Sequence, residues 1–326
     1  MIYGKLPGIA KPISRLVQGC MMLKEGDEHR AWSFERLDEA VAIGINTFDH
    51  GHIYGGGQCQ RVFGEWLAAR GNREDVVILD KGCHTRGTQA VVKPEYITEE
   101  LLADLERLGT DYVDLWLFHR DDPTYPVGPL IDCLNEHVAA GRIKAFGASN
   151  WSTARIAEAN AYAAANGLVG FCCSSPNFSL AEQVDSPWGT DCVTISGPAN
   201  VAECDWYREN GVAVFAWSSL ARGFFSGRIT RANWDSIKGD WEEHIDRCYA
   251  TPDNFERLDR CEALGKSKGL TVAQIALAFV LNQPFDVYAL VGAYNAQENA
   301  SNLEAVTTKL TAQELAYLDL KADSPA

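Results

Sequence analysis

Short apolar segments with the composition of buried strands alternate with segments of helical periodicity along almost the whole sequence. The first seven of these strands follow one another at intervals of about 30 to 40 residues, with a helical segment between successive strands. This alternation is typical of a parallel α/β fold, because a crossover helix returns the chain to the same end of the sheet. We expect eight strands, over residues 16–20, 45–49, 76–81, 112–119, 143–147, 169–174, 212–217 and 287–291.

The helices are predicted from apolar residues at helical spacing and from the residue types that start and end helices. Ser33 is the expected N-cap of the first helix, and Pro94 opens a long helix that ends at Gly109. A short hairpin over residues 1–12, placed to plug the bottom of a barrel, precedes the first strand. The other expected helices run from about 59 to 69, 130 to 141, 153 to 166, up to 211, 272 to 281, 296 to 306 and 312 to 320.

Two folds accommodate such a series of parallel strands: a closed barrel and an open sheet with helices on both faces. No G-x-G-x-x-G motif follows the first strand, which argues against the open sheet that binds dinucleotides. Polar residues cluster at the carboxyl ends of the strands, and barrel sites lie on that face. We therefore expect a single domain over residues 1–326, a (β/α)8 TIM barrel with an N-terminal β-hairpin and extended loops after the sixth and seventh strands.

Charge and cysteine content narrow the choice of partners. The formal net charge of −15 argues against attraction to nucleic acid or to an anionic membrane. The ten cysteines are scattered, without a C-x-x-C pair or the spacing of a closed zinc site, so we expect no metal. The amino terminus lacks the apolar core of a signal peptide, and no apolar run approaches the length of a membrane span. These features predict a cytoplasmic protein with reduced thiols and no nucleic-acid or membrane partner.

Three consecutive strands end in residues that suit proton transfer. Residues 45–55 join a strand ending in Asp49 to a glycine-bounded loop that carries Tyr54, and the next two strands end at Lys81 and His119. An ammonium beside a tyrosine stabilises its phenolate, and a buried ammonium needs a carboxylate partner. A neutral histidine can then orient a carbonyl oxygen through a hydrogen bond. Each residue alone has a structural alternative, as a turn, a solvated strand end or a packed side chain, but together the four indicate a catalytic set.

These residues resemble the signature of the aldo-keto reductases, and the resemblance extends from the turn Gly19-Cys20-Met21 to the loop after the last strand. It implies a (β/α)8 barrel that reduces an aldehyde, a ketone or a sugar-like carbonyl compound with a nicotinamide cofactor. In this comparison Tyr54 is the proton donor. The residues that match the catalytic tetrad of the family are Asp49, Tyr54, Lys81 and His119.

Further residues match the cofactor contacts of the family. Ser149 and Asn150 resemble the pair that holds the nicotinamide carboxamide, although the pattern by itself would predict a helix N-cap. Trp217 resembles the aromatic residue that stacks on the nicotinamide, and Arg228 offers a charge-assisted donor to a phosphate. The expected cofactor contacts are Gly19, Cys20, Met21, Asp49, Ser149, Asn150, Ser175, Trp217, Ser218, Leu220, Arg222, Gly223, Arg228, Gly292, Tyr294, Glu298 and Asn302.

Four positions depart from the family pattern. Ser175 stands where the family usually carries a glutamine under the nicotinamide, so a carboxamide contact is shortened or lost. Tyr294 adds no charge near the adenosine, and Glu298 places a carboxylate near the 2′ position, where it repels a phosphate. The resemblance and Arg228 favour NADP(H) by a modest margin, and these departures leave NAD(H) open. His50 stands where many members have threonine, and we expect it to be a packed residue.

The substrate is predicted only by class. Loops expected over the barrel mouth carry several tryptophans beside charged residues, which suits a sugar-like or hydroxylated carbonyl compound; the alternative is that the tryptophans pack the loops. The rival function is a cofactor-binding regulatory subunit with little turnover, because potassium-channel β subunits resemble the same family. We expect a monomer or a weak oligomer. The residues concerned are Trp151, Trp188, Trp234, Trp241, Arg120, Asp121 and Asp122.

Overall fold

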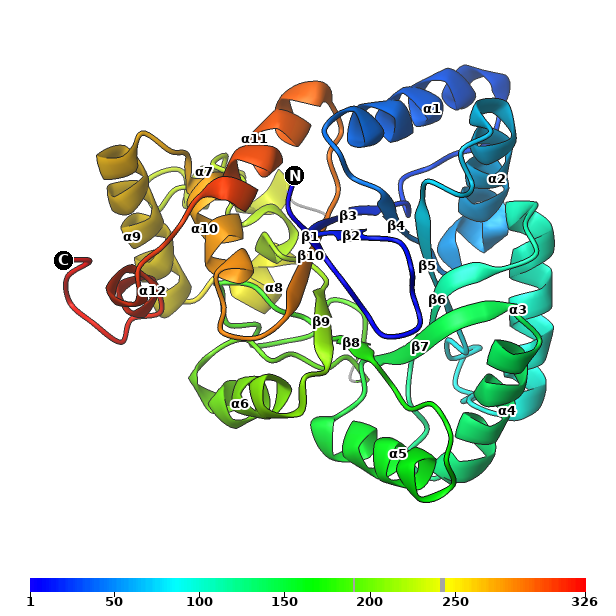
Figure 1. The fold of residues 1–326 in the computed structure, drawn as a ribbon. Coiled ribbons are helices and arrows are strands. Elements are labelled where there is room, and N and C mark those ends of the chain that lie inside the picture. Colours follow the sequence, from blue (N-terminus) through cyan, green and yellow to red (C-terminus); the bar gives the residue numbers. More distant parts are fainter. Residues whose placement is uncertain (190, 241–243) are drawn as a thin grey trace.

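Eight parallel strands close into a barrel that is ringed by helices (Figure 1). The computed structural model describes residues 1–189, 191–240 and 244–326. The last barrel strand pairs with the first, with Ala289 opposite Leu16, and this closure confirms the predicted barrel. The strands are β3 (Leu16–Gly19), β4 (Thr47–Asp49), β5 (Val77–Gly82), β6 (Val113–Phe118), β7 (Ile143–Ser149), β8 (Cys173–Ser175), β9 (Ala213–Ala216) and β10 (Val287–Val291).

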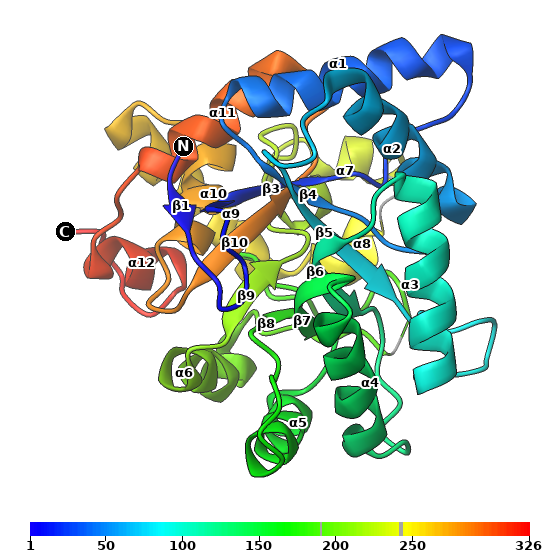
Figure 2. The same cartoon turned by 45° about the vertical axis from the view of Figure 1, so that its right-hand side comes forward.

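The helices cover the outside of the barrel, and the view in Figure 2 shows α1, α2 and α3 side by side along one flank. Two short 3₁₀ helices, η1 (Tyr54–Gly57) and η3 (Ala221–Gly223), lie in the loops after β4 and β9. The α-helices are α1 (Asp27–Ala42), α2 (Gln58–Arg70), α3 (Pro94–Leu108), α4 (Val127–Ala139), α5 (Thr153–Ala165), α6 (Val201–Asn210), α7 (Trp234–Ile237), α8 (Ile245–Tyr249), α9 (Pro252–Lys268), α10 (Val272–Leu281), α11 (Ala296–Thr307) and α12 (Ala312–Leu318).

Helix ends that carry strong capping signals lie where the sequence predicts them. α3 begins with Pro94 in its first turn and ends at Gly109. Gly109 has a φ of 63°, a left-handed conformation that glycine adopts without strain. α10 begins at a capping box in which Thr271 and Gln274 satisfy each other's backbone N–H groups. The bounds of α10 and β10 agree with the prediction to the residue.

The first helix and the sixth barrel strand differ from the prediction. α1 begins at Asp27, and Ser33 is buried inside it with its hydroxyl near the backbone of Lys24, so Ser33 is not an N-cap. β8 starts only at Cys173, because the side chain of Asn160 binds both the N–H and the carbonyl of Phe171. The N–H and the carbonyl of Phe171 are therefore occupied and do not pair with a neighbouring strand.

The amino-terminal hairpin forms, but its second strand lies further along the chain than predicted. β1 (Tyr3–Gly4) pairs with β2 (Ile13–Ser14), with Tyr3 opposite Ser14. The intervening Leu6 and Ile9 are buried in the cluster that fills the inside of the barrel, so this segment packs instead of pairing. The hairpin thus plugs the barrel, as expected.

Long connections follow the sixth and seventh strands, as predicted. The segment after β8 extends to α6, and the segment after β9 contains η3, α7, α8 and α9 before α10. α9 was not predicted, because its surface carries many charged residues and only a narrow apolar stripe. Its start is nevertheless marked by Thr251, whose side chain accepts a hydrogen bond from the N–H of Asn254, and by Pro252.

The alternation of side chains along β5 positions one functional residue. Val77 and Leu79 point into the barrel, while Ile78 belongs to the layer between the strands and the helices. Two residues beyond Leu79, Lys81 points inward again, at the carboxyl end of the barrel.

Among the described residues, no single helix is long and apolar enough to cross a membrane. The pair α9 and α10 reaches the required length and composition only when taken together, and the two helices are bent by 99° at their junction.

Candidate active site

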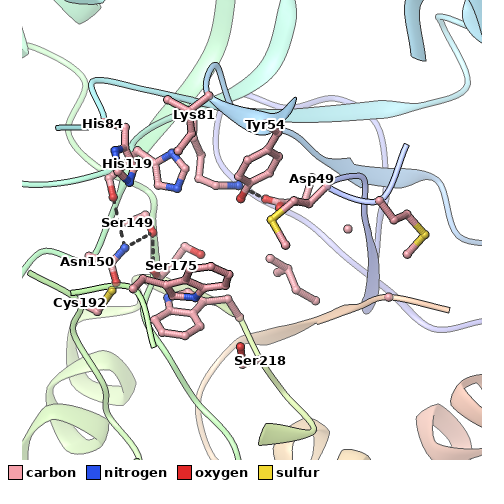
Figure 3. A pocket seen from close by; sticks show the side chains of 18 of the residues that line it. Asp49, Tyr54, Lys81, His84, His119, Ser149, Asn150, Ser175, Cys192 and Ser218 are labelled. Atoms are coloured by element: carbon pink, nitrogen blue, oxygen red, sulfur yellow. Dashed lines mark hydrogen bonds and ion pairs between the residues drawn. The ribbon is translucent and has the colours of Figure 1, made fainter. Parts of the chain in front are cut away.

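A cavity of about 650 Å³ opens at the carboxyl ends of the barrel strands. All four members of the predicted catalytic set line it, and Figure 3 shows their side chains converging on one side of the cavity. Most of the expected cofactor contacts line it as well. These are Gly19, Met21, Asp49, Ser149, Asn150, Ser175, Trp217, Ser218, Arg222, Gly292 and Tyr294.

The ladder between β4 and β5 continues past the end of β4 and holds the loop that carries Tyr54. The N–H of His50 donates to the carbonyl of Leu79 at 2.8 Å, and the N–H of His52 donates to the carbonyl of Lys81 at 2.7 Å. Tyr54 then begins η1, with its N–H bonded to the carbonyl of Gly51. The backbone therefore fixes the distance between the tyrosine loop and the lysine strand.

Lys81 lies at the centre of the predicted catalytic set. Its ammonium donates to the Asp49 carboxylate and, at 2.8 Å, to the carbonyl of His50. The Nζ atom lies 5.2 Å from the centre of the Tyr54 ring, and that ring meets the His119 ring edge-on at 5.7 Å between centroids. Asp49, Lys81 and His119 are buried, so these contacts form away from bulk water.

Burial and charge set the protonation states of the four residues. Burial raises the pKa of Tyr54 to about 12, with the Lys81 ammonium opposing the shift, so the phenol is protonated at neutral pH. Burial would lower the pKa of Lys81, but Asp49 and Tyr54 outweigh it and raise the value. Burial raises the pKa of the Asp49 carboxyl, with Lys81 acting against it. Burial and the nearby Lys81 charge lower the pKa of His119 well below its usual range, so its imidazole is neutral.

The polar residues on the opposite wall are bonded to one another. Ser149 Oγ donates to the carbonyl of Ser175 at 2.8 Å, and the Asn150 amide donates to Ser149 Oγ at 3.0 Å and to the carbonyl of His119 at 3.2 Å (Figure 3). Asn150 Oδ1 accepts from the N–H of Val193 at 3.1 Å, and Ser175 Oγ donates to the carbonyl of Phe215. A ligand amide that binds here must share or exchange these bonds.

Comparison with known proteins identifies the family. A sequence model of the Aldo/keto reductase family matches residues 15–323. The chain belongs to the aldo-keto reductase family. It is 29% identical to aldo-keto reductase str7 of Strobilurus tenacellus over 90% of this chain and 80% of that protein. It is 26% identical, over 87% of this chain and 82% of the relative, to a Schizosaccharomyces pombe protein named "Putative voltage-gated potassium channel subunit beta".

The fold is also that of a solved aldo-keto reductase. The thermostable aldo-keto reductase Tm1743, solved in complex with the inhibitor epalrestat, superposes with a TM-score of 0.74 at 22% identity, covering 99% of this chain and all of the other. The chain therefore has the fold and family of an oxidoreductase, and members of this family use nicotinamide cofactors, generally NADPH.

The residues of this aldo-keto reductase fit a nicotinamide dinucleotide. Trp217 lines the cavity, and its buried Nε1 has no hydrogen-bond partner among the described residues. Ser218, Ala221 and Arg222 have φ angles of 54°, 49° and 54°, and turns with left-handed residues can bind phosphate oxygens through backbone N–H groups. In this turn the N–H groups of Ala221 and Gly223 already donate to backbone carbonyls. Arg222 also lines the cavity, with its guanidinium 4.2 Å from the Trp188 ring centre.

Six expected cofactor contacts are not among the residues that line the cavity. Cys20 is buried in the core between the strands and the helices. The Glu298 carboxylate accepts hydrogen bonds from the N–H of Tyr294 at 2.9 Å and from the Asn295 amide at 3.2 Å, which ties it to the start of its own helix. The six residues are Cys20, Leu220, Gly223, Arg228, Glu298 and Asn302.

The tryptophans predicted to form a substrate platform have different positions. Trp188 lines the cavity, whereas Trp151 is buried, stacks on Phe118 at 5.1 Å and donates to the carbonyl of Arg120. Trp234 packs against Phe255 at 5.7 Å. Trp241 lies outside the described residues.

The charged residues that follow His119 in the sequence also have different positions. Arg120 lines the cavity. Asp121 instead lies 3.5 Å from the Arg155 guanidinium, and Asp122 accepts hydrogen bonds from Thr124. His50 is fully buried with its ring 4.4 Å from that of Phe63, as a packed residue would be.

Several cavity residues were not predicted. His84 meets the His119 ring edge-on at 4.8 Å, and its position three residues after Lys81, just past a strand end, was a usable signal. Cys192 comes from the long segment after β8, where no pattern marks it. The other unpredicted residues are Met22, Ile53, Gly55, Leu290 and Val291.

Proposed function

We propose that this aldo-keto reductase reduces the carbonyl group of an aldehyde, a ketone or a sugar-like compound with a reduced nicotinamide cofactor. The observation that carries the proposal is the position of the Tyr54 ring at the cavity wall, 5.2 Å from the Nζ atom of the Lys81–Asp49 ion pair and 5.7 Å from the ring of the neutral His119. When bound, the cofactor supplies the hydride for the carbonyl carbon. The protein then has to supply one proton to the oxygen.

Tyr54 is the proposed proton donor. Its phenol is protonated at neutral pH, because its pKa is raised to about 12, and proton loss to a developing alkoxide leaves a phenolate beside the Lys81 ammonium. Asp49 compensates the buried charge of Lys81 before the transfer. A ring N–H of the neutral His119 orients the carbonyl oxygen toward Tyr54.

NADP(H) is the proposed cofactor by a modest margin, with measurable use of NAD(H). Trp217 and Arg222 line the cavity and offer a ring face to the nicotinamide and a charge to a phosphate. Arg228, which is not among the lining residues, is included because of its match to the family pattern. Glu298 opposes a 2′-phosphate, because its carboxylate accepts a hydrogen bond from the N–H of Tyr294, which lines the cavity. We also propose a monomer or weak oligomer that works in the cytoplasm, on the basis of the strong net charge and the many free thiols.

The first test is oxidation of NADPH and NADH by the purified protein with a panel of small aldehydes, ketones and sugars, together with the Tyr54→Phe variant. We expect the variant to lose roughly 10²–10⁴-fold in turnover and to keep its cofactor affinity, measured by quenching of tryptophan fluorescence. A variant within a few-fold of wild-type turnover would remove Tyr54 from the donor role.

A cofactor-binding regulatory subunit is the second candidate, because one relative carries the name of a potassium-channel β subunit. Tight binding of NADPH without turnover of any compound in the same panel would favour that candidate.

A further inference from the structure

Cationic side chains dominate the charged lining of the cavity, although the whole protein is strongly acidic. Among the described residues, Lys81, Arg120 and Arg222 line it, and Asp49 is the one carboxylate in the lining. Asp49 already compensates Lys81. Arg222 lies against Trp188, in the wall assigned above to phosphates. Arg120 remains, and neither the proposed proton transfer nor the proposed cofactor contacts use it.

The guanidinium of Arg120 has fewer hydrogen bonds than its burial demands. Arg120 is only 4% exposed, and a guanidinium has five N–H donors. Its Nη1 group donates to the carbonyl of His119 at 2.9 Å, and among the described residues the Arg120 side chain makes no other hydrogen bond. Buried donors without acceptors are costly, so the remaining N–H groups need an acceptor, and an anion suits them best.

Asp191 is close to Arg120 but does not meet this demand. Its Oδ2 lies 2.9 Å from Arg120 Nε, yet Nε has no hydrogen-bond partner in the described part of the chain, because the N–H is not directed at that oxygen. The Asp191 side chain is 43% exposed, so it can turn into water at little cost. The segment around Asp191 is held independently by the hydrogen bond from the N–H of Val193 to Asn150.

The charge of Arg120 acts at the reacting end of the cavity. It directly follows His119, and it lowers the pKa values of Tyr54, His119 and His84, although burial is the largest influence on each. Figure 3 places Cys192, the neighbour of Asp191 in sequence, on the same side of the cavity as His84 and His119. An anionic group bound by Arg120 therefore lies near the carbonyl that Tyr54 protonates.

We propose that Arg120 binds a carboxylate of the substrate, and that Asp191 competes for the same guanidinium. The preferred substrates are then oxo acids, which are aldehydes or ketones that carry a carboxylate. This inference rests on the proposed carbonyl reduction and names its substrate class. Arg120 acts as a specificity-determining residue, while Tyr54 remains the proton donor.

The test compares oxo acids with their primary amides, which have nearly the same shape without the charge. Pyruvate, succinic semialdehyde and para-carboxybenzaldehyde, each beside its amide, cover three distances between carbonyl and carboxylate. We expect at least one acid to exceed its amide in kcat/KM by about 10- to 100-fold, as for a charge-assisted hydrogen bond, with most of the difference in KM. Ratios near one for all three pairs would overturn the inference and leave the proposed function standing.

Two variants separate this role from simple anchoring of the Asp191 segment. Arg120→Gln should bring the acid-to-amide ratio close to one, whereas Asp191→Asn should raise the ratio above that of the wild type. An ion pair that serves only as an anchor predicts the same direction for both variants and for both members of each pair. That result would overturn the inference, and circular dichroism checks that each variant is folded.

A binding experiment keeps the test independent of turnover. Quenching of tryptophan fluorescence by benzoate and by benzamide gives two dissociation constants for the cofactor-saturated protein. We expect benzoate to bind about tenfold more tightly or better in the wild type, and this advantage to disappear in Arg120→Gln. Equal constants in the wild type would overturn the inference even if no carbonyl compound in the panel is reduced.

Discussion

Replacing Lys81 with methionine tests the electrostatic core of the site. Methionine has a similar length and no charge, and Lys81 is only 3% exposed, so the substitution mainly removes the ammonium. It leaves the Asp49 carboxylate, also 3% exposed, without its partner. Removal of one member of a buried ion pair usually costs about 3–5 kcal/mol, because the remaining charge stays desolvated. We expect a loss of that size in the free energy of unfolding at neutral pH.

The loss should depend on pH with a definite sign. Burial raises the pKa of Asp49, and without Lys81 nothing opposes this shift, so the folded variant binds a proton more tightly than the unfolded chain. For an acid with a raised pKa in the folded state, stability is lost as the pH rises through that value. The variant should therefore recover stability relative to the wild type as the pH falls from about 7 toward about 4, by up to about 1.4 kcal/mol per pH unit.

Urea denaturation followed by tryptophan fluorescence measures both effects, with the double variant Asp49→Asn/Lys81→Met as the matched control. The double variant leaves no unpaired buried charge, so we expect it to regain most of the lost stability and to show little pH dependence. The activity of Lys81→Met should also fall and its pH–rate profile should move, because Tyr54 loses the charge that stabilises its phenolate. A single-variant loss below about 1 kcal/mol that does not change with pH would refute the reasoning.

Three further predictions concern the cofactor, a buried acid and a helix contact. Glu298→Gln should shift the ratio of the dissociation constants toward NADP(H); unchanged constants would show that Glu298 does not face the 2′ position. Burial raises the pKa of Asp104 to about 7, with Arg107 opposing, so this acid contributes stability that is lost as the pH rises through that value. Asp104→Asn should flatten the pH dependence of urea unfolding between about 4 and 7, and an unaltered dependence would contradict this assignment. A Cβ at Gly64 would lie 2.7 Å from the carbonyl oxygen of Arg107, so Gly64→Ala should lower the thermal midpoint and cost about 1–3 kcal/mol, whereas Gly239→Ala, with nothing within 4 Å, should not.

Local pattern predicts the barrel and the catalytic set for one physical reason. Parallel strands joined by helices all end at the same face, so residues at consecutive strand ends meet even though they lie far apart in sequence. Asp49, Lys81 and His119 follow this rule. The same holds for α3 and α10, whose caps are made by residues within a few positions of the helix ends.

Other features required contacts that local pattern does not encode. The start of β8 depends on Asn160, a residue of a neighbouring helix whose amide binds the backbone of Phe171. α9 has only a narrow apolar stripe among many charged residues, and the helix is held by the packing of that stripe, which includes Phe255, Leu258 and Leu264, in the core.

The same division runs through the site. The residue types and the order of the strands follow from the sequence, and they are sufficient to predict that Asp49, Tyr54 and Lys81 meet at one cavity. The unsatisfied guanidinium of Arg120, its partial pairing with Asp191 and the bonds that occupy Asn150 exist only in the folded protein. Arg120 and Asp191 are 71 positions apart, and Asn150 and Val193 are 43 positions apart, so these contacts depend on the packing of distant segments and not on the neighbouring sequence.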